Sequence, residues 1–293
     1  MPQIGLPGAC SGGASVKTSA IFLGICLCAT TVGLNGQAAK PATPKATLAA
    51  ISERGRALYA YDQAAWKGTD AVFALKPQPK TEGMTHYICI KTPQGWHVIF
   101  PRWNSAHDQL VVAYEATQTA DGKYDARAID PPKVGDKQVQ TTALALELAI
   151  NDFKKPQRPY NAAILPAPAG NFYVYLYPGQ IKANAWPIGG DVRYTISGDG
   201  QKILDKRQLH KTILDAEPKA GSNEVAGYHF HILSDLPEDT DVLYVMNRKP
   251  SMPEYIVAGQ DKKTFLINTD GSITTGPDKN QKAATAPTKS GKK

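Results

Sequence analysis

Residues 192–210 read VRYTISGDGQKILDKRQLH, two strand-like runs joined by the pair Asp199-Gly200. An Asp-Gly pair readily adopts the positive φ angles that a tight hairpin turn requires. The same pair separates strand-like runs at Asp121-Gly122 and Asp270-Gly271, and Thr92-Pro93-Gln94-Gly95 has proline at the second position of a fourth turn. These turns predict a sheet built mainly from antiparallel hairpins.

Two segments outside the hairpins have helical periodicity. Residues 47–66 carry apolar side chains at three- and four-residue steps, although Gly55 interrupts the pattern: Leu48, Ile51, Leu58, Ala65 and Trp66. Residues 142–153 have the same spacing of apolar side chains, at Leu146, Ala149, Ile150 and Phe153. Pro156 ends this helix. Because strands and helices do not alternate regularly, we predict an α+β fold with a mainly antiparallel sheet, hairpins and two principal helices.

The first 39 residues have the pattern of a secretory signal peptide. Lys17 precedes an apolar run over residues 20–34, and small residues follow at 36–39. This run is shorter than the roughly 20 residues that a membrane-spanning helix needs. We therefore expect a soluble periplasmic or secreted protein that is not an integral membrane protein after signal cleavage. An uncleaved N-terminal anchor is the alternative.

Composition divides the rest of the chain into four segments. They are a linker (40–45), an N-terminal α+β region (46–155), a β-rich region (156–275) and a basic tail (276–293), and the two middle regions form one domain or two. Lys17 and the tail carry about five of the seven net positive charges. The other Lys and Arg residues do not cluster with aromatic side chains, so we expect no nucleic-acid partner.

The segment Gly227-Tyr228-His229-Phe230-His231 indicates a metal site. Strand alternation places both imidazoles on one face and turns the side chains of Tyr228, Phe230 and Ile232 to the other face, which we expect to pack in the core. A loop with four carboxylates follows: Asp235, Glu238, Asp239 and Asp241. His210 lies on the return strand of the 192–210 hairpin, and ideal two-residue pairing places it on a polar, site-facing side.

Imidazole nitrogens and carboxylate oxygens are ligands that zinc takes in three- and four-coordinate sites. The candidate ligands are therefore His229 and His231 together with His210 or Asp241, and the metal would be zinc or another divalent transition metal. In a hydrolytic reaction at this metal, Asp235 or Glu238 is the candidate general base. The alternative is a solvent-facing side of the sheet that carries two histidines by chance.

The same segment resembles the signature of the JAB/MPN metalloproteases, in which a His-x-His pair and a downstream aspartate hold zinc. The resemblance covers about fifteen residues and implies His229, His231 and Asp241 as ligands. That family has serine and aspartate at the positions of Asp239 and Val242, so Asp241 comes one residue early. The proline after the second histidine is missing and the upstream glutamate base has no clear counterpart, so we do not assign the chain to the family.

Residues 172–177, Phe-Tyr-Val-Tyr-Leu-Tyr, predict a strand whose alternate side chains are tyrosines. We expect one face to point inward, with Phe172, Val174 and Leu176, and the other to form an outward row of Tyr173, Tyr175 and Tyr177. An exposed row of this kind suits the binding of a sugar or an extended peptide. The alternative is a half-buried face covered by a helix, because tyrosine is a common strand residue.

The sequence gives little support to other chemistries. After residue 39 it has no nucleophile elbow, P-loop, His-Glu-x-x-His or Cys-x-x-Cys motif, and Cys89 lies in an apolar pattern typical of a buried thiol. Two functional hypotheses follow. The first, which we favour, is a non-enzymatic exported binding or structural module whose sheet surface binds an envelope peptide, glycan or protein. The second is a metal-dependent hydrolase built on His229 and His231.

Overall fold

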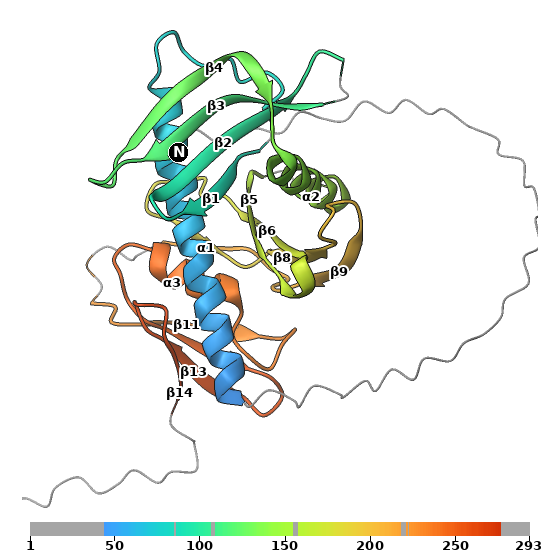
Figure 1. The fold of residues 1–293 in the computed structure, drawn as a ribbon. Coiled ribbons are helices and arrows are strands. Elements are labelled where there is room, and N and C mark those ends of the chain that lie inside the picture. Colours follow the sequence, from blue (N-terminus) through green and yellow to red (C-terminus); the bar gives the residue numbers. More distant parts are fainter. Residues whose placement is uncertain are drawn as a thin grey trace, which may run out of the picture.

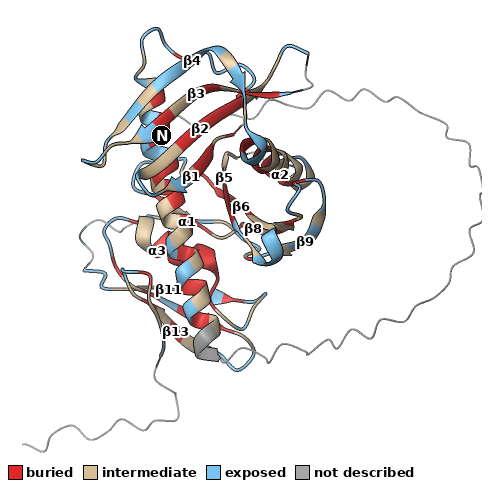
Figure 2. Cartoon of the chain, in the orientation of Figure 1, coloured by how far each residue is buried: buried red, intermediate tan, exposed pale blue. Residues whose placement is uncertain are grey.

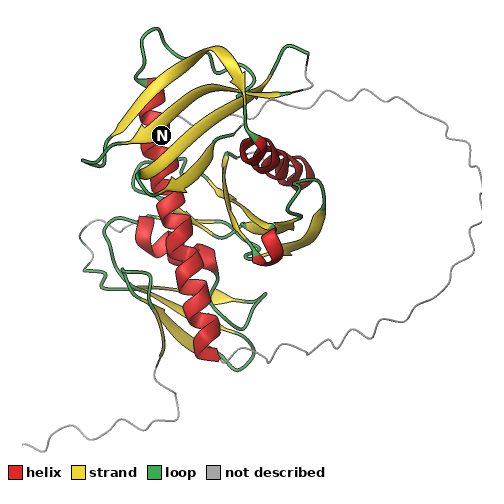
Figure 3. Cartoon of the chain, in the orientation of Figure 1, coloured by secondary structure: helices red, strands yellow, loops and turns green. Residues whose placement is uncertain are grey.

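Helix α1 (Pro44–Phe73) runs the length of the computed structural model, and the sheets lie around it (Figure 1). The structure describes residues 44–84, 86–106, 109–154, 158–217, 221 and 223–276. Within these ranges it contains two further α-helices, α2 (Lys137–Phe153) and α3 (Asp239–Asn247), and the short 3₁₀ helix η1 (Pro168–Gly170). Figure 3 shows the three α-helices placed between the sheets.

Three four-stranded sheets and one two-stranded sheet are formed by the described residues. The first has the order β1 (Ile88–Thr92), β2 (Gly95–Trp103), β3 (Leu110–Gln118), β4 (Tyr124–Val134). The second has the order β5 (Tyr160–Pro166), β6 (Phe172–Pro178), β8 (Val192–Ile196), β9 (Ile203–Gln208). The third has the order β11 (Gly227–His231), β12 (Glu254–Ala258), β13 (Lys263–Ile267), β14 (Ile273–Thr275), and β7 (Trp186–Ile188) pairs with β10 (Leu214–Ala216).

The predicted α+β class and the hairpins are confirmed. Among the described strands every pairing is antiparallel except that of β11 with β12, and each of the four predicted turns joins two neighbouring antiparallel strands. The glycines of these turns all have positive φ: Gly95, Gly122, Gly200 and Gly271. The turns are set by local backbone preferences, which is why the sequence could place them.

The helices are longer and more numerous than predicted. α1 extends to Phe73, and α2 begins at Lys137 because the side chain of Asp136 accepts a hydrogen bond from the Val139 backbone N–H at 2.8 Å. Helix α3 was not expected, because its first turn contains Asp239 and Asp241 and resembles a polar loop. Acidic residues in a first turn are stabilised by the positive end of the helix dipole.

Gly55 does not end α1 but lets it approach α3 closely. A Cβ at this position would lie 2.3 Å from the Cβ of Val242 and 2.7 Å from the Asp239 carbonyl oxygen. The apolar face predicted for the helix is buried at Leu48, Ile51, Leu58 and Ala65. Figure 2 shows buried and exposed stretches alternating along α1. Trp66 is the exception, because 43% of its surface is exposed.

Several predictions concern residues that the structure does not describe. The expected signal peptide (1–39), most of the linker (40–45) and nearly all of the tail (276–293) lie outside the described residues, and so does the centre of the expected boundary near 155–157. The last two residues of the expected linker, Pro44 and Lys45, belong to α1. In the part of the chain that the structure describes, none of the helices is both long and apolar enough to cross a membrane.

Candidate metal centre

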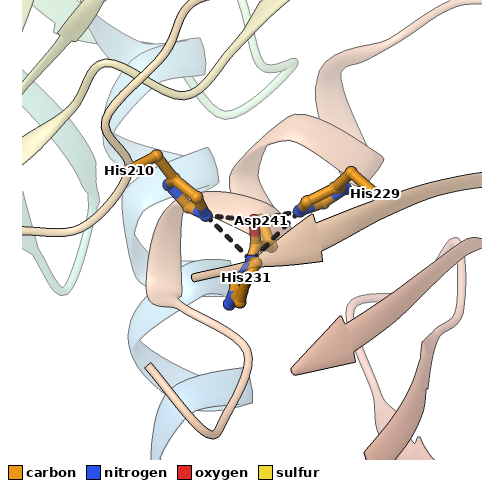
Figure 4. A group of neighbouring side chains, drawn as sticks. All are labelled: His210, His229, His231 and Asp241. Atoms are coloured by element: carbon orange, nitrogen blue, oxygen red, sulfur yellow. Dashed lines mark hydrogen bonds and ion pairs between the residues drawn. The ribbon is translucent and has the colours of Figure 1, made fainter. Parts of the chain in front are cut away.

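Strand β11 lies at the edge of its sheet and carries His229 and His231 on the same side. The prediction that its aromatic residues pack in the core is wrong, since Tyr228 is 71% and Phe230 63% exposed. The side with the histidines is the buried one, because it faces α3 and the segment after β9 (Figure 4). Burial of imidazole groups and exposure of aromatic rings on one strand indicate that the histidines have a specific partner.

The other two members of the site come from distant parts of the chain. His210 follows the end of β9, and a bulge at Ile196 changes the ideal hairpin register by one residue. His210 still reaches the site, because the Leu209 backbone N–H donates to the Asp191 carbonyl at 3.0 Å and extends the hairpin. Asp241 is the third residue of α3, and the Glu238 backbone N–H donates to its Oδ2 at 2.6 Å.

Four side chains, those of His210, His229, His231 and Asp241, converge on one point (Figure 4). Nε2 of His231 lies 2.9 Å from Nε2 of His210 and 3.1 Å from Nε2 of His229. Asp241 lies between them: its Oδ1 is 3.2 Å from His210 Nε2 and 3.1 Å from His229 Nε2, and its Oδ2 is 3.2 Å from His231 Nε2. The structure thus brings together all four residues that the sequence predicted as ligands.

The other ring nitrogen of each histidine faces an acceptor. His210 Nδ1 lies 2.8 Å from Asp191 Oδ1, and His229 Nδ1 lies 2.9 Å from Glu254 Oε1. His231 Nδ1 lies 2.9 Å from the Leu236 carbonyl oxygen. Because a carbonyl and an ionised carboxylate can only accept, each Nδ1 carries the proton, and in a neutral ring the Nε2 lone pair then points to the centre.

Sequence reasoning missed these three acceptors. Asp191 could have been found, because it directly precedes the strand opposite the one that leads to His210 in the same hairpin. No pattern in the sequence indicated that Glu254 lies beside His229. Glu254 belongs to β12, whose parallel pairing with β11 joins segments more than twenty residues apart. Parallel pairing needs a long crossover connection, and local turn residues do not reveal it.

The charges of the site favour bound cations. Burial opposes charging of His210, but the carboxylates of Asp241 and Asp191 outweigh it and raise its pKa to about 11. At His229 the hydrogen bonds to Asp241 and Glu254 likewise outweigh burial and raise the pKa to about 9. Burial alone would raise the pKa of Asp241, yet the charges of His210 and His231 hold it well below its ordinary value. Protons or a metal ion therefore stabilise the cluster.

The two carboxylates that the sequence offered as general bases have different surroundings. Glu238 is buried and forms an ion pair with Arg207. Asp235 lies against Gly259, where an added Cβ would meet its Oδ1 at 2.3 Å. Neither residue belongs to the group of side chains that converge on the centre.

The expected outward row of tyrosines does not form. Tyr175 and Tyr177 are buried, and only Tyr173 keeps partial exposure, as the alternative of a covered face anticipated. The hydroxyl of Tyr175 donates to Asp239 at 2.7 Å, and that of Tyr177 donates to Asp62 at 2.8 Å. The three tyrosines therefore do not form the exposed row that the sequence predicted.

A hollow of about 530 Å³ opens beside the four converging side chains. His210 and His229 border it, and exposed apolar side chains of Tyr228, Phe230 and Leu233 form much of its wall. Exposed apolar clusters of this kind mark binding sites more often than ordinary surface. The hollow gives a small molecule a route to the edge of the cluster.

Comparison of the chain with family models, curated proteins and solved structures gave no match in any of the three. The function is therefore argued from the site itself.

Proposed function

We propose that the protein binds one divalent transition-metal ion, zinc in the first place, through His210, His229, His231 and Asp241. The observation that carries the proposal is the orientation of the rings, since all three Nδ1 atoms face acceptors and all three Nε2 atoms face one point. The lone pairs of three imidazole rings and a buried carboxylate that converge in this way repel one another unless protons or a metal ion lie between them.

The distances agree with this proposal. In a tetrahedral zinc site with bonds of 2.0–2.1 Å the ligand atoms are about 3.3 Å apart. Five distances between the imidazole Nε2 atoms and the Asp241 oxygens are 2.9–3.2 Å. All the candidate ligand atoms lie within 4.8 Å of one another. An ion at the centre needs only a small outward movement of the side chains.

The ion would also connect three segments of the fold. His210 follows β9, the pair His229 and His231 belongs to β11, and Asp241 lies in the first turn of α3. These segments are far apart in the sequence, so metal binding adds to the free energy of unfolding in proportion to the logarithm of metal concentration over Kd.

The test is the metal content of tag-free protein, residues 40–293, measured by mass spectrometry after purification without chelators. We expect about one zinc, manganese or iron ion per chain in the wild type and none in the His229→Gln/His231→Gln double variant. His97→Gln is the matched control, because His97 pairs with Glu115 on β3, outside the cluster. Wild-type protein that holds no metal and takes up no added zinc would refute the proposal.

Metal-dependent hydrolysis is the second candidate function. It is favoured by the hollow of about 530 Å³ that His210 and His229 border, because a substrate there could reach the metal as a fifth ligand. It is opposed by the ion pair that occupies Glu238. Hydrolysis of apolar ester or amide probes by zinc-loaded protein, lost in His229→Gln, would support it, and inactivity of fully loaded protein would refute it.

We also propose, as the sequence predicted, that the protein is exported from the cytoplasm. The pattern over residues 1–39 supports a periplasmic or secreted location, and the partner would then be an envelope peptide, glycan or protein. N-terminal sequencing of the protein recovered from outside the cytoplasm tests this: cleavage near residue 39 supports export, and an intact Met1 opposes it.

A further inference from the structure

A second hollow, of about 270 Å³, lies between α1 and α3. Each helix lines it with residues at positions i, i+3, i+4 and i+7: Tyr59, Asp62, Gln63 and Trp66 from α1, and Thr240, Leu243, Tyr244 and Asn247 from α3. Strand β7 and the ends of β5 and β6 complete the wall. Its volume is near the lower end of the range for small-molecule sites.

The polar side chains beside this hollow are connected by hydrogen bonds. Tyr177 donates to Asp62 Oδ1 at 2.8 Å, and Asn247 donates to Asp62 Oδ2 at 3.0 Å. Gln63 donates in turn to the Asn247 side-chain oxygen at 3.0 Å. These bonds hold the amide groups in fixed orientations, which is the arrangement that specific recognition of a polar ligand needs.

Two of the residues that line the hollow also carry a buried polar atom without a partner among the described residues. Oδ2 of Asp191 and Oγ1 of Thr240 are buried and have no hydrogen bond within the described part of the chain. Asp191 is 1% and Thr240 7% exposed. A buried polar atom without a partner costs about 1–3 kcal/mol, so a ligand or water that satisfies it is stabilising.

Aromatic rings form the other part of the wall. Trp66 and Trp186 line the hollow together with Tyr59, and all three keep partial or full exposure. The exposure of Trp66 is notable because the periodicity of α1 predicts that it packs in the core. A tryptophan turned from the core into a polar hollow provides a flat apolar surface for a ligand.

We propose that this hollow binds a neutral saccharide. A sugar ring offers an apolar C–H face that stacks on aromatic rings and a rim of hydroxyl groups that both donate and accept hydrogen bonds. The aromatic walls match the first property, and the carboxylate of Asp191, the hydroxyl of Thr240 and the neighbouring amides match the second. A simple cation is disfavoured by the positive charge of Lys249, which lines the hollow together with the acids.

The proposed saccharide site and the candidate metal centre share Asp191, but none of the four converging side chains lines the hollow. Oδ1 of Asp191 contacts His210, and its Oδ2 is buried without a partner in the part of the chain that the structure describes. Variants at the aromatic wall leave all four converging side chains in place. Saccharide binding and metal binding can therefore fail independently of each other.

The test is an array of neutral mono- and oligosaccharides, followed by calorimetric titration and tryptophan fluorescence of the tag-free protein with each saccharide that binds. We expect binding that quenches tryptophan fluorescence, and a Kd about tenfold higher in Trp66→Ala, which removes an exposed stacking ring. Thr240→Val removes one hydroxyl at nearly constant shape and should also weaken binding. Tyr255→Ala, a partly exposed aromatic outside the hollow, is the control and should bind as the wild type does.

Metal content is measured on the same variants to separate the two sites. Weakened saccharide binding with unchanged metal content in Trp66→Ala supports the proposal. No binding across the array, or binding that Trp66→Ala and Thr240→Val leave unchanged, overturns it. Choline that binds in the same hollow while the saccharides do not would also overturn it, since the site would then recognise a cation.

Discussion

Zinc added to the metal-free protein at pH 7 should displace about two protons from the cluster. The pKa of His210 is raised to about 11 and that of His229 to about 9, so both rings are charged at pH 7 before the metal binds. Their Nδ1 atoms already donate to Asp191 and Glu254, so the additional proton lies on Nε2, the atom that must bind zinc. Metal binding therefore requires its release.

The magnitude follows from this count. Each proton released makes the affinity rise tenfold per pH unit, so two protons give about a hundredfold per unit between pH 6 and 8. Calorimetric titration in two buffers of different ionisation enthalpy measures the protons directly. His210→Gln should reduce the release by about one proton, and His97→Gln should leave it unchanged. A Kd for zinc that is the same at pH 6.5 and 7.5, with no proton released, would refute the reasoning.

The stability of the metal-free protein depends on pH in the opposite direction to its affinity for zinc. Both folded pKa values lie above the ordinary value of 6.5, so the charged rings stabilise the fold fully below about pH 6.5. That contribution is lost as the pH rises through about 9 and 11. The metal-free form is therefore expected to lose stability in alkali, in the range where the zinc-loaded form binds its ion most tightly.

Three further predictions concern other parts of the structure. Glu254→Gln, which replaces the carboxylate that orients His229, should weaken zinc binding by about 10–100-fold in a chelator competition. Gly55→Val should lower the free energy of unfolding by about 1–3 kcal/mol in urea, because the new side chain meets Val242; unchanged stability would contradict the close packing. Burial lowers the pKa of His86 to about 4, below its unfolded value of 6.5, so acid favours unfolding between those values. His86→Gln should remove up to about 1.4 kcal/mol per pH unit from the slope of stability over this window, measured by urea unfolding at several pH values.

Local sequence signals predicted what depends on a few neighbouring residues. The turns at Gly122, Gly200 and Gly271 need positive φ, and the residues that permit it are adjacent in the chain. The sequence also indicated which side chains converge, because alternation places His229 and His231 together and the hairpin leads back to His210; their binding of a metal stays a prediction. Helix α3 was missed because its acidic first turn resembles a loop.

The predictions that failed concern which face of an element is covered. Alternation separates the two faces of β11 but does not say which one is buried, and the apolar face, with Tyr228 and Phe230, is the exposed one. The same holds for Tyr175 and Tyr177, whose hydroxyls find partners inside the protein. Trp66 fits the helical stripe in sequence but lies beside a hollow in space.

The sequence by itself determined the α+β class, the hairpins, much of α1 and α2, and the identity of the converging histidines and aspartate. Periodicity and turn residues act over a few positions, and so they can be recognised in the chain. Only the tertiary structure decided that α3 exists, that the histidine face is the inner one, and that Asp191, Glu254 and the Leu236 carbonyl orient the three rings. These features depend on contacts between segments far apart in the sequence, whose free energy is gained only when the segments pack together.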